Sequence, residues 1–178
     1  MHKGEAGRIG IIGGSLEYTG APFYVGISAL KVGCDLVHIF CPASAAMPIK
    51  SYSPELIVHP LLDADNAIDL IEPWLSRLHV LVIGSGLGRD RNILRTVSEL
   101  ILSCKKSQIP LVIDADGLFL ITQDTSLLND YQNVILTPNG MELFRLIGDT
   151  DDKLQVLIEK VGKNVIVLEK AMNDRIYD

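Results

Sequence analysis

Five turns in the sequence carry residues that could do chemistry, and each of them follows a short apolar run. They comprise residues 13–20, 84–90, 114–117, 137–142 and 169–174. Glycine-rich turns expose backbone N–H groups to phosphate or ribose, carboxylates can hold Mg²⁺, and a Lys supplies a point charge for phosphate. Together the five turns predict a nucleotide or phosphoryl-transfer site.

Two of these turns are rich in glycine. Residues 13–20 contain three glycines, and this content fits a ligand-binding turn and a simple strand-to-helix turn equally well. The second turn begins Gly84-Ser85-Gly86-Leu87-Gly88, whose alternating glycines suit close backbone contact with a phosphate or a ribose. Its spacing is neither the dinucleotide-binding G-x-G-x-x-G nor a Walker motif, and Asp90 after it is expected to cap a helix.

Two carboxylates follow the apolar run that ends at Ile113. Asp114 comes directly after the run and could hold Mg²⁺ or orient a hydroxyl group, or it could bond to nearby backbone. Asp116 is expected to cap the helix that follows. Asp114 is therefore the better functional candidate of the two.

The last two turns combine amide, carboxylate and cationic side chains. Asn139 and Glu142 are three residues apart, which is the spacing of a capping box. Arg145, one helical turn later, could pair with Glu142 or reach an anionic ligand. Lys170 could act as a charge toward phosphate or lie in a solvated turn. The residues by themselves leave these alternatives open.

The elements that must position the five turns alternate along the chain. Apolar runs rich in β-branched residues predict strands at 8–13, 36–41, 56–59, 80–83, 111–113, 134–136 and 165–168. Longer amphipathic stretches predict helices at 21–32, 64–75, 91–105, 117–123, 141–147 and 154–161, the second of them ended early or kinked by Pro73. Residues 174–178 resemble the start of a further strand that has nothing after it to pair with or cover it.

This alternation predicts an α/β fold with a mostly parallel central sheet and helices on both faces, incomplete at the C-terminus. In such a sheet the carboxyl ends of the strands meet at one edge, where ligands bind. We therefore expect the five turns to lie close together.

Composition narrows the class of function. The 178 residues suffice for one domain, and 48% hydrophobic with 21% charged residues excludes a disordered tail. A net charge of -6 argues against nucleic acid as a partner, and no apolar run has the length of a membrane span. Cys34, Cys41 and Cys104 are expected to be free thiols in a reducing compartment, the cytoplasm or the mitochondrion. His38 and His59 are expected to be structural, and no zinc spacing occurs.

Seven motifs follow one another in a recognisable order. They are Gly7-Arg8-Ile9-Gly10-Ile11-Ile12-Gly13-Gly14, Tyr18-Thr19-Gly20-Ala21-Pro22, Ser28-Ala29-Leu30-Lys31-Val32-Gly33, Ser53-Pro54-Glu55-Leu56, Gly86-Leu87-Gly88, Ile113-Asp114-Ala115-Asp116-Gly117 and Leu136-Thr137-Pro138-Asn139. Their combination, which covers nearly the whole chain, resembles the ATP-dependent NAD(P)H-hydrate dehydratases, most closely the eukaryotic branch.

The resemblance implies a ribokinase-like fold, in one domain over residues 1–178, and a lyase that repairs damaged nucleotides. Its substrates would be the S forms of NADH-hydrate and NADPH-hydrate, with ATP and Mg²⁺ as cofactors. ATP would phosphorylate the C6 hydroxyl group, and loss of phosphate would then restore NADH or NADPH.

The resemblance also implies roles for individual residues. Those matching the hydrate-binding positions are Gly86, Asn139, Gly140, Met141, Glu142, Leu143, Phe144 and Arg145. Those matching the ATP-binding turn are Lys170, Ala171, Met172, Asn173 and Asp174, with Asp114 as a supporting residue. Ser85 and Ala171 stand where the family often has Pro and Gly.

The family's Gly-Gly-x-Gly-Asp segment, which supplies its anion hole and catalytic Asp, has no counterpart in the sequence. We therefore expect a C-terminally truncated domain with no catalytic residue of its own, little repair activity and poor solubility caused by an exposed sheet edge. Two alternatives are a non-catalytic fragment that only binds nucleotide, and another ribokinase-like kinase of small molecules.

Overall fold

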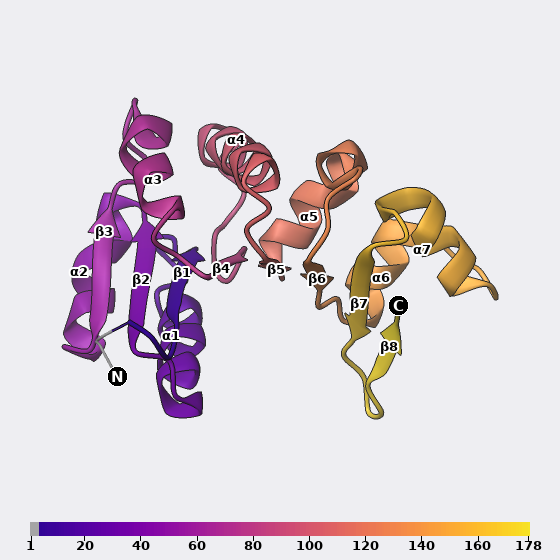
Figure 1. The fold of residues 1–178 in the computed structure, drawn as a ribbon, viewed down its shortest axis with the longest axis horizontal. Helices are drawn as coiled ribbons and strands as arrows, with labels where there is room; N and C mark the ends of the chain where they lie inside the picture. Colours follow the sequence, from indigo (N-terminus) through magenta and orange to yellow (C-terminus); the bar gives the residue numbers. More distant parts are fainter. Residues whose placement is uncertain (1–3) are drawn as a thin grey trace.

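Strands and helices alternate along the part of the chain that the computed structural model describes, residues 4–178 (Figure 1). The strands are β1 (Arg8–Ile12), β2 (Leu36–Cys41), β3 (Leu56–Pro60), β4 (Val80–Ile83), β5 (Leu111–Ile113), β6 (Val134–Leu136), β7 (Val165–Glu169) and β8 (Arg175–Tyr177). The helices are α1 (Gly20–Val32), α2 (Ala43–Tyr52), α3 (Ala67–Leu75), α4 (Arg91–Lys106), α5 (Asp116–Gln123), α6 (Gly140–Ile147) and α7 (Lys153–Val161), with a 3₁₀ turn at Thr125–Leu128. The first three residues of the domain expected over residues 1–178 lie outside the described part.

The strands form one sheet in the order β3-β2-β1-β4-β5-β6-β7-β8. All neighbouring strands are parallel except β7 and β8. The chain runs outward from β1 to β3 and then returns to place β4 on the other side of β1. Such a reversal opens a crevice beyond the carboxyl ends of the strands, where α/β proteins bind ligands. The predicted α/β fold with a mostly parallel sheet is confirmed. The reversal lies between β1 and β4, the neighbouring strands that lead into the two glycine-rich turns.

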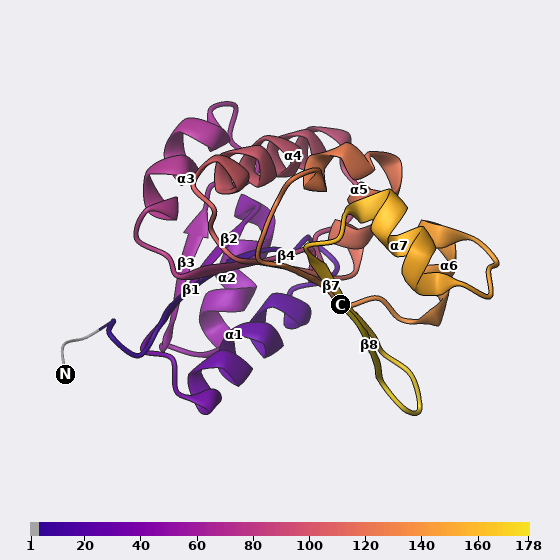
Figure 2. The ribbon, with the colours of Figure 1, turned by 45° about the vertical axis from the view of Figure 1, so that its right-hand side comes forward.

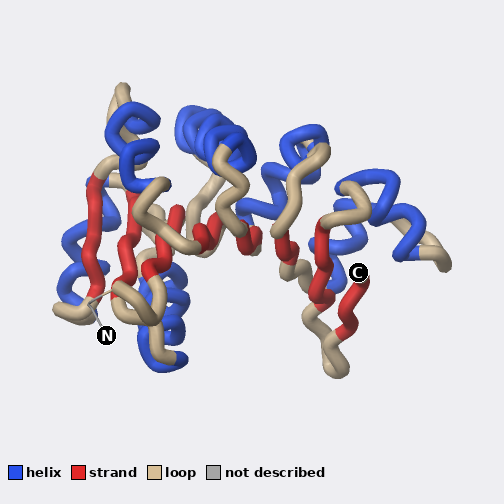
Figure 3. Tube along the Cα trace, viewed as in Figure 1, coloured by secondary structure: helices blue, strands red, loops and turns tan. Residues whose placement is uncertain are grey.

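Helices cover the sheet on both faces. α1 and α2 lie on one face, and α3 to α7 lie on the other (Figures 2 and 3). The alternation of side chains along β2 follows this division, because Val37 and Ile39 pack in the core cluster under α1 and α2. Phe40, between Ile39 and the end of the strand, packs in the larger cluster under the other helices.

One row of apolar side chains on the α1 and α2 face is covered incompletely. Val82, Val112, Ile135 and Ile166 are neighbours across β4 to β7, and the first of them packs against the cluster under α1 and α2. Ile135 is 36% exposed and Ile166 41% exposed, although parallel strands are usually buried on both faces. This row is an apolar surface that can drive self-association.

We expect the double substitution Ile135→Thr and Ile166→Thr to reduce self-association of the chain. Threonine keeps the β-branched shape that suits a strand but removes exposed apolar surface. Light scattering measured over a range of protein concentrations tests this. Met172→Thr is the matched control, because Met172 is 99% exposed but isolated at a hairpin tip. A double variant that associates as strongly as the unmodified chain would contradict the prediction.

The structure corrects the sequence interpretation at two helices. Helix α2 was not predicted, because Pro48 in its middle removes a backbone donor and hides the helical pattern. Helix α3 begins three residues later than predicted, at Ala67, and continues two residues past Pro73. The strand expected to start within residues 174–178 is present as β8, which pairs antiparallel with β7, the strand before it in the chain.

Candidate functional site

The five turns meet at the carboxyl edge of the sheet, and each is hydrogen-bonded to the next. Gly14 N donates to Ser85 O at 3.0 Å, and Gly88 N donates to Asp116 Oδ2 at 2.9 Å. Thr137 Oγ1 then donates to Asp114 Oδ1 at 3.0 Å, and Lys170 N donates to Pro138 O at 2.8 Å. The predicted convergence of the turns is therefore confirmed as one continuous hydrogen-bonded rim.

The two glycine-rich turns pack against each other so closely that side chains do not fit between them. A Cβ atom on Gly13 would lie 2.4 Å from Ser85 O. Gly86 has φ +64°, and a Cβ atom there would lie 2.7 Å from Tyr18 O. Glycine is thus needed at both positions for packing, whatever ligand the turns receive.

Asp114 and Lys170 form an ion pair across the ends of β5 and β7. Lys170 Nζ lies 2.6 Å from Asp114 Oδ1, and the same oxygen accepts the hydroxyl of Thr137. Both side chains keep contact with solvent, with 43% of Lys170 and 30% of Asp114 exposed. The carboxylate of Asp114 thus bonds to side chains of two neighbouring turns, and not to nearby backbone as one of the two alternatives required. The pair holds a cation at the rim where an anionic ligand can reach it.

Asp116 does not cap α5, contrary to the sequence interpretation. The N-cap residue of α5 is Ala115, which makes no side-chain cap hydrogen bond. Both oxygens of Asp116 instead reach the second glycine-rich turn, where they accept from Gly88 N at 2.9 Å and from Arg89 Nε at 3.2 Å. Asp116 therefore fixes that turn against α5.

The turn between the two carboxylates holds a residue in an unfavourable conformation. Ala115 has φ +47° and ψ -117°, a region that side-chain-bearing residues rarely adopt. The turn is closed by a hydrogen bond from Gly117 N to Asp114 O at 2.9 Å. This conformation directs Asp114 toward Lys170 and Asp116 toward Gly88.

We expect Ala115→Gly to raise the free energy of unfolding by about 1 kcal/mol. Glycine relieves strain of roughly 1–3 kcal/mol, and its greater freedom in the unfolded chain offsets roughly 0.4–1 kcal/mol of that gain. Urea denaturation of the variant measures the change. Ala29→Gly, the same substitution inside α1, is the control and should lower stability by about 1 kcal/mol. Equal losses in both variants would show that Ala115 is not strained.

The predicted capping box at the start of α6 is confirmed. Asn139 Oδ1 accepts from Met141 N and Glu142 N at 3.0 Å each, and Glu142 Oε2 accepts from Asn139 N at 2.8 Å. Glu142 is therefore engaged with backbone, and no ion pair or hydrogen bond in the described part of the chain involves Arg145. Of the two roles considered for Arg145, contact with an anionic ligand is the one that its surroundings favour.

The side chains of the segment from Asn139 to Arg145 differ in their exposure to solvent. Leu143 is 1% exposed and belongs to the hydrophobic core, so its side chain cannot contact a ligand at the surface. Met141 and Phe144 are 61% and 52% exposed. The ligand-accessible part of this segment is thus the capped backbone at its start with the exposed side chains around it.

Residues 170–174 form the exposed connection between β7 and β8. Ala171 N donates to Asp174 Oδ1 at 3.0 Å, which closes the turn. At its base Lys170 forms a parallel bridge with Asn139. The turn expected to bind ATP and the segment expected to bind the hydrate are therefore direct neighbours.

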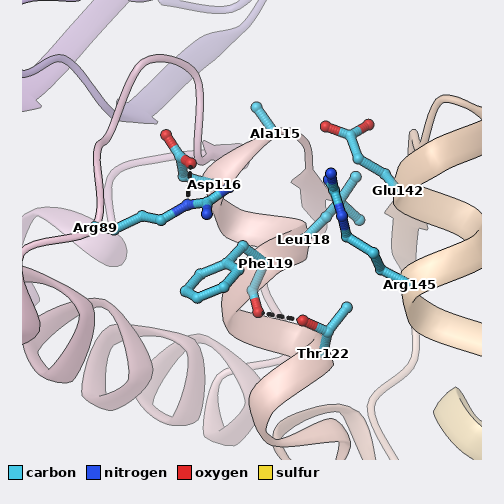
Figure 4. Close-up of a pocket in the computed structure, with 8 residues that line it drawn as sticks. All are labelled: Arg89, Ala115, Asp116, Leu118, Phe119, Thr122, Glu142 and Arg145. Carbon is cyan, nitrogen blue, oxygen red and sulfur yellow. Dashed lines mark hydrogen bonds and ion pairs between the residues drawn. The ribbon is translucent and has the colours of Figure 1, made fainter.

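Arg89 is a site residue that sequence reasoning missed. It lines a cavity of about 80 Å³ together with Asp116, Phe119, Glu142 and Arg145 (Figure 4). Its guanidinium carbon lies 4.2 Å from the centre of the Phe119 ring. The signal available in the sequence was its position between Gly88 and the helix cap Asp90, whose side chain accepts from the backbone of α4 as predicted.

His38, on β2, and His59, on β3, lie side by side. His38 Nδ1 and His59 Nε2 are 3.0 Å apart and pack around Trp74, which fits their predicted structural role. In the described residues 4–178, no group of three or more His, Cys, Asp or Glu side chains is arranged to hold a metal ion. Cys34, Cys41 and Cys104 are free, and burial raises the pKa of the last two to about 12. None of the helices in residues 4–178 has the length and apolar character of a membrane span.

The histidine pair should make stability depend on pH. Burial, then the neighbouring His38, lowers the pKa of His59 from 6.5 to about 4. Between these values the unfolded chain binds the proton and the folded chain does not, so stability should be full above pH 6.5 and should decline as pH falls toward 4. Because His59 is half-exposed, we expect a loss of about 1 kcal/mol. Denaturation curves of the chain and of His59→Gln at several pH values test this, and parallel pH profiles would contradict it.

Comparison with known proteins identifies similar chains. A sequence profile of the NAD(P)H-hydrate dehydratase family matches residues 9–177. The ATP-dependent (S)-NAD(P)H-hydrate dehydratase of Aedes aegypti is 68% identical over 177 residues, which cover 99% of this chain and 53% of that protein. The enzyme of the same name from Drosophila melanogaster is 54% identical over 99% of this chain and 59% of its own. The chain thus spans little more than half the length of these curated relatives.

Solved structures share the fold. A ribokinase-like superfamily protein from Enterococcus faecalis matches with a TM-score of 0.82 at 24% identity, covering 99% of this chain and 62% of that one. The ADP/ATP-dependent NAD(P)H-hydrate dehydratase of Bacillus subtilis, co-crystallised with ATP and Mg²⁺, matches with a TM-score of 0.66 at 21% identity, covering 99% and 62%. These matches confirm the ribokinase-like fold.

Proposed function

Because the chain belongs to the NAD(P)H-hydrate dehydratase family, we propose that it binds ATP and the S forms of NADH-hydrate and NADPH-hydrate for ATP-dependent dehydration. The proposed hydrate contacts are Gly86 and residues 139–145, of which the buried Leu143 can contribute only its backbone. The proposed ATP contacts are residues 170–174, with Asp114 in support. The free cysteines support the cytoplasm or the mitochondrion as its compartment.

The observation that carries this proposal is the hydrogen bond from Lys170 N to Pro138 O, at 2.8 Å, with the adjoining bridge between Asn139 and Lys170. Phosphoryl transfer depends on placing donor and acceptor side by side and on balancing the charge of the transferred group. The bridge puts the two proposed binding segments next to each other, and Lys170 adds a positive charge at their junction. A phosphate donor and a hydroxyl acceptor bound there would be neighbours.

The proposed reaction has two steps. In the first, the C6 oxygen of the hydrate forms a bond to the γ-phosphorus of ATP, the bond to the β-phosphate oxygen breaks, and ADP leaves. In the second, the C6–O bond breaks, phosphate leaves with the electron pair, and loss of the C5 proton restores the C5–C6 double bond. Lys170 can balance phosphate charge in the first step; no residue of this chain is assigned the proton transfers.

Asp114 fits a role toward Mg²⁺. This ion usually binds through one or two carboxylates together with substrate phosphates, and it neutralises phosphate charge during transfer. Asp114 offers one carboxylate beside Lys170, where the phosphates of ATP are proposed to lie.

Isothermal titration of the 178-residue chain with each hydrate and with ATP tests the proposal, and recovery of NADH absorbance from the hydrate measures turnover in parallel. We expect the S hydrates to bind more tightly than the R hydrates. Binding with turnover supports the full reaction, and binding without turnover supports the alternative of a fragment that only binds nucleotide. Absence of binding to both S hydrates would refute the proposed function.

A further inference from the structure

Arg89 borders a cavity that is too small for a whole nucleotide. The cavity measures about 80 Å³, whereas pockets that enclose a drug-sized ligand have roughly 300 Å³ or more. It opens between α5 and α6, beside residues 139–145, with Arg89 and Arg145 on different sides of the first turn of α5 (Figure 4). The cavity can therefore receive one compact group of a ligand that lies mostly outside it.

Two guanidinium groups that line this cavity, those of Arg89 and Arg145, have hydrogen-bond donors that no residue in the described part of the chain uses. Asp116 uses both oxygens, for Gly88 N and Arg89 Nε, and Glu142 accepts from the backbone of Asn139. Arg89 contributes only its Nε to this network, so both of its Nη groups are free of hydrogen bonds to residues 4–178. Arg145 also has no hydrogen bond or ion pair in that part of the chain, so two guanidinium groups can donate to an anion here, beside the carboxylates of Asp116 and Glu142.

Arg89 is held in place before any ligand arrives. The salt bridge to Asp116 Oδ1 at 3.2 Å fixes one edge of the guanidinium group, and the ring of Phe119, 4.2 Å away, supports its face. A guanidinium fixed in this way loses little freedom when it binds, and its free edge matches two oxygens of a phosphate. This arrangement favours a phosphate group over a single carbonyl or hydroxyl oxygen.

We propose that Arg89, together with Arg145, binds a phosphate group of the dinucleotide hydrate in this cavity. The inference rests on the proposed function and adds to it a contact outside residues 139–145 and Gly86. Two phosphate sources have the required chemistry: the pyrophosphate linkage, which both hydrates contain, and the 2′-phosphate, which only NADPH-hydrate carries. Only if the 2′-phosphate is the one bound would a preference between the two hydrates depend on Arg89.

The test compares Arg89→Gln with Arg91→Gln in titrations with NADH-hydrate and NADPH-hydrate. Arg91 is exposed, lies two residues away and does not line the cavity. Its substitution by Gln changes the net charge by the same amount and is therefore the matched control. We expect Arg89→Gln to weaken binding about tenfold to a hundredfold and Arg91→Gln to have little effect. Arg89→Lys should weaken binding to an intermediate degree, because it keeps the charge but loses the planar fork. Melting temperatures verify that each variant is folded.

A double-mutant cycle with Arg145→Gln provides a second measurement. If both guanidinium groups hold the same phosphate, the losses in the double variant will not be additive. An equal loss for both hydrates supports the pyrophosphate, and a loss confined to NADPH-hydrate supports the 2′-phosphate. Unchanged binding by Arg89→Gln, or an equal loss in Arg91→Gln, would overturn the inference while leaving the proposed function intact. If the unmodified chain binds neither hydrate, both fail.

Discussion

Substitution of Gly84 by Ala is expected to lower the free energy of unfolding by roughly 3–5 kcal/mol, the combined cost of overpacking and backbone strain. Gly84 has φ +115°, and a Cβ atom there would lie 1.9 Å from Asp114 O and 2.4 Å from Gly117 N. These two atoms close the turn between the carboxylates Asp114 and Asp116, so the backbone of β4 or of that turn must move. Urea denaturation monitored by circular dichroism measures the loss.

Gly20→Ala is the matched control for this prediction. A Cβ atom on Gly20 has its nearest neighbour, a ring carbon of Tyr24, at 4.0 Å, and the residue begins a helix. Its substitution should change stability by no more than about 0.5 kcal/mol. If Gly84→Ala proved as stable as Gly20→Ala, the second and third turns would not be packed as closely as the structure shows.

Lys170→Met is expected to weaken ATP binding by about tenfold to a hundredfold, because it removes a charge-assisted contact to phosphate and leaves Asp114 facing the ligand unpaired. Stability should change by less than about 1 kcal/mol, since the ion pair is partly exposed. Isothermal titration with ATP in the presence of Mg²⁺ measures the affinity. The prediction therefore separates a binding role from a structural one.

Two further variants complete this experiment. Lys163→Met removes the same charge at the opposite end of β7 and should leave ATP affinity unchanged. Asp114→Asn tests the supporting residue, and its effect on affinity should depend on Mg²⁺ if the carboxylate helps to hold the ion. ATP affinities that are equal in Lys170→Met and Lys163→Met would exclude Lys170 from the ATP contact.

Much of the sheet could be predicted from the sequence because its central strands are short, β-branched and bounded by polar or turn residues. β2, β4, β5 and β6 begin and end at the predicted residues. Helix α2 could not be found in this way, since Pro48 interrupts its pattern and the tertiary packing of Ala45 and Ile49 outweighs that local signal. Local propensity was sufficient where it agreed with packing and failed where the two disagreed.

The site was predictable in its location but not in its contacts. A parallel sheet with a reversal of strand order brings the turns together whatever their exact sequence, which is why their convergence could be predicted. The role of Asp116 could not be predicted, because it depends on the positive φ of Ala115 and on the close approach of two turns that are far apart in the chain. Arg89 was missed for the same reason, since its partner Phe119 lies on another element.

The bridge between Asn139 and Lys170 has a thermodynamic consequence. The two proposed ligands would bind on either side of this shared backbone contact, so their binding can be coupled. If the first ligand changes the affinity of the second by some factor, the second must change the affinity of the first by the same factor. Cooperativity between nucleotide and hydrate, of either sign, would thus be readable from either titration. Because free energy is a state function, the order in which the two ligands arrive does not change the total free energy of the ternary complex.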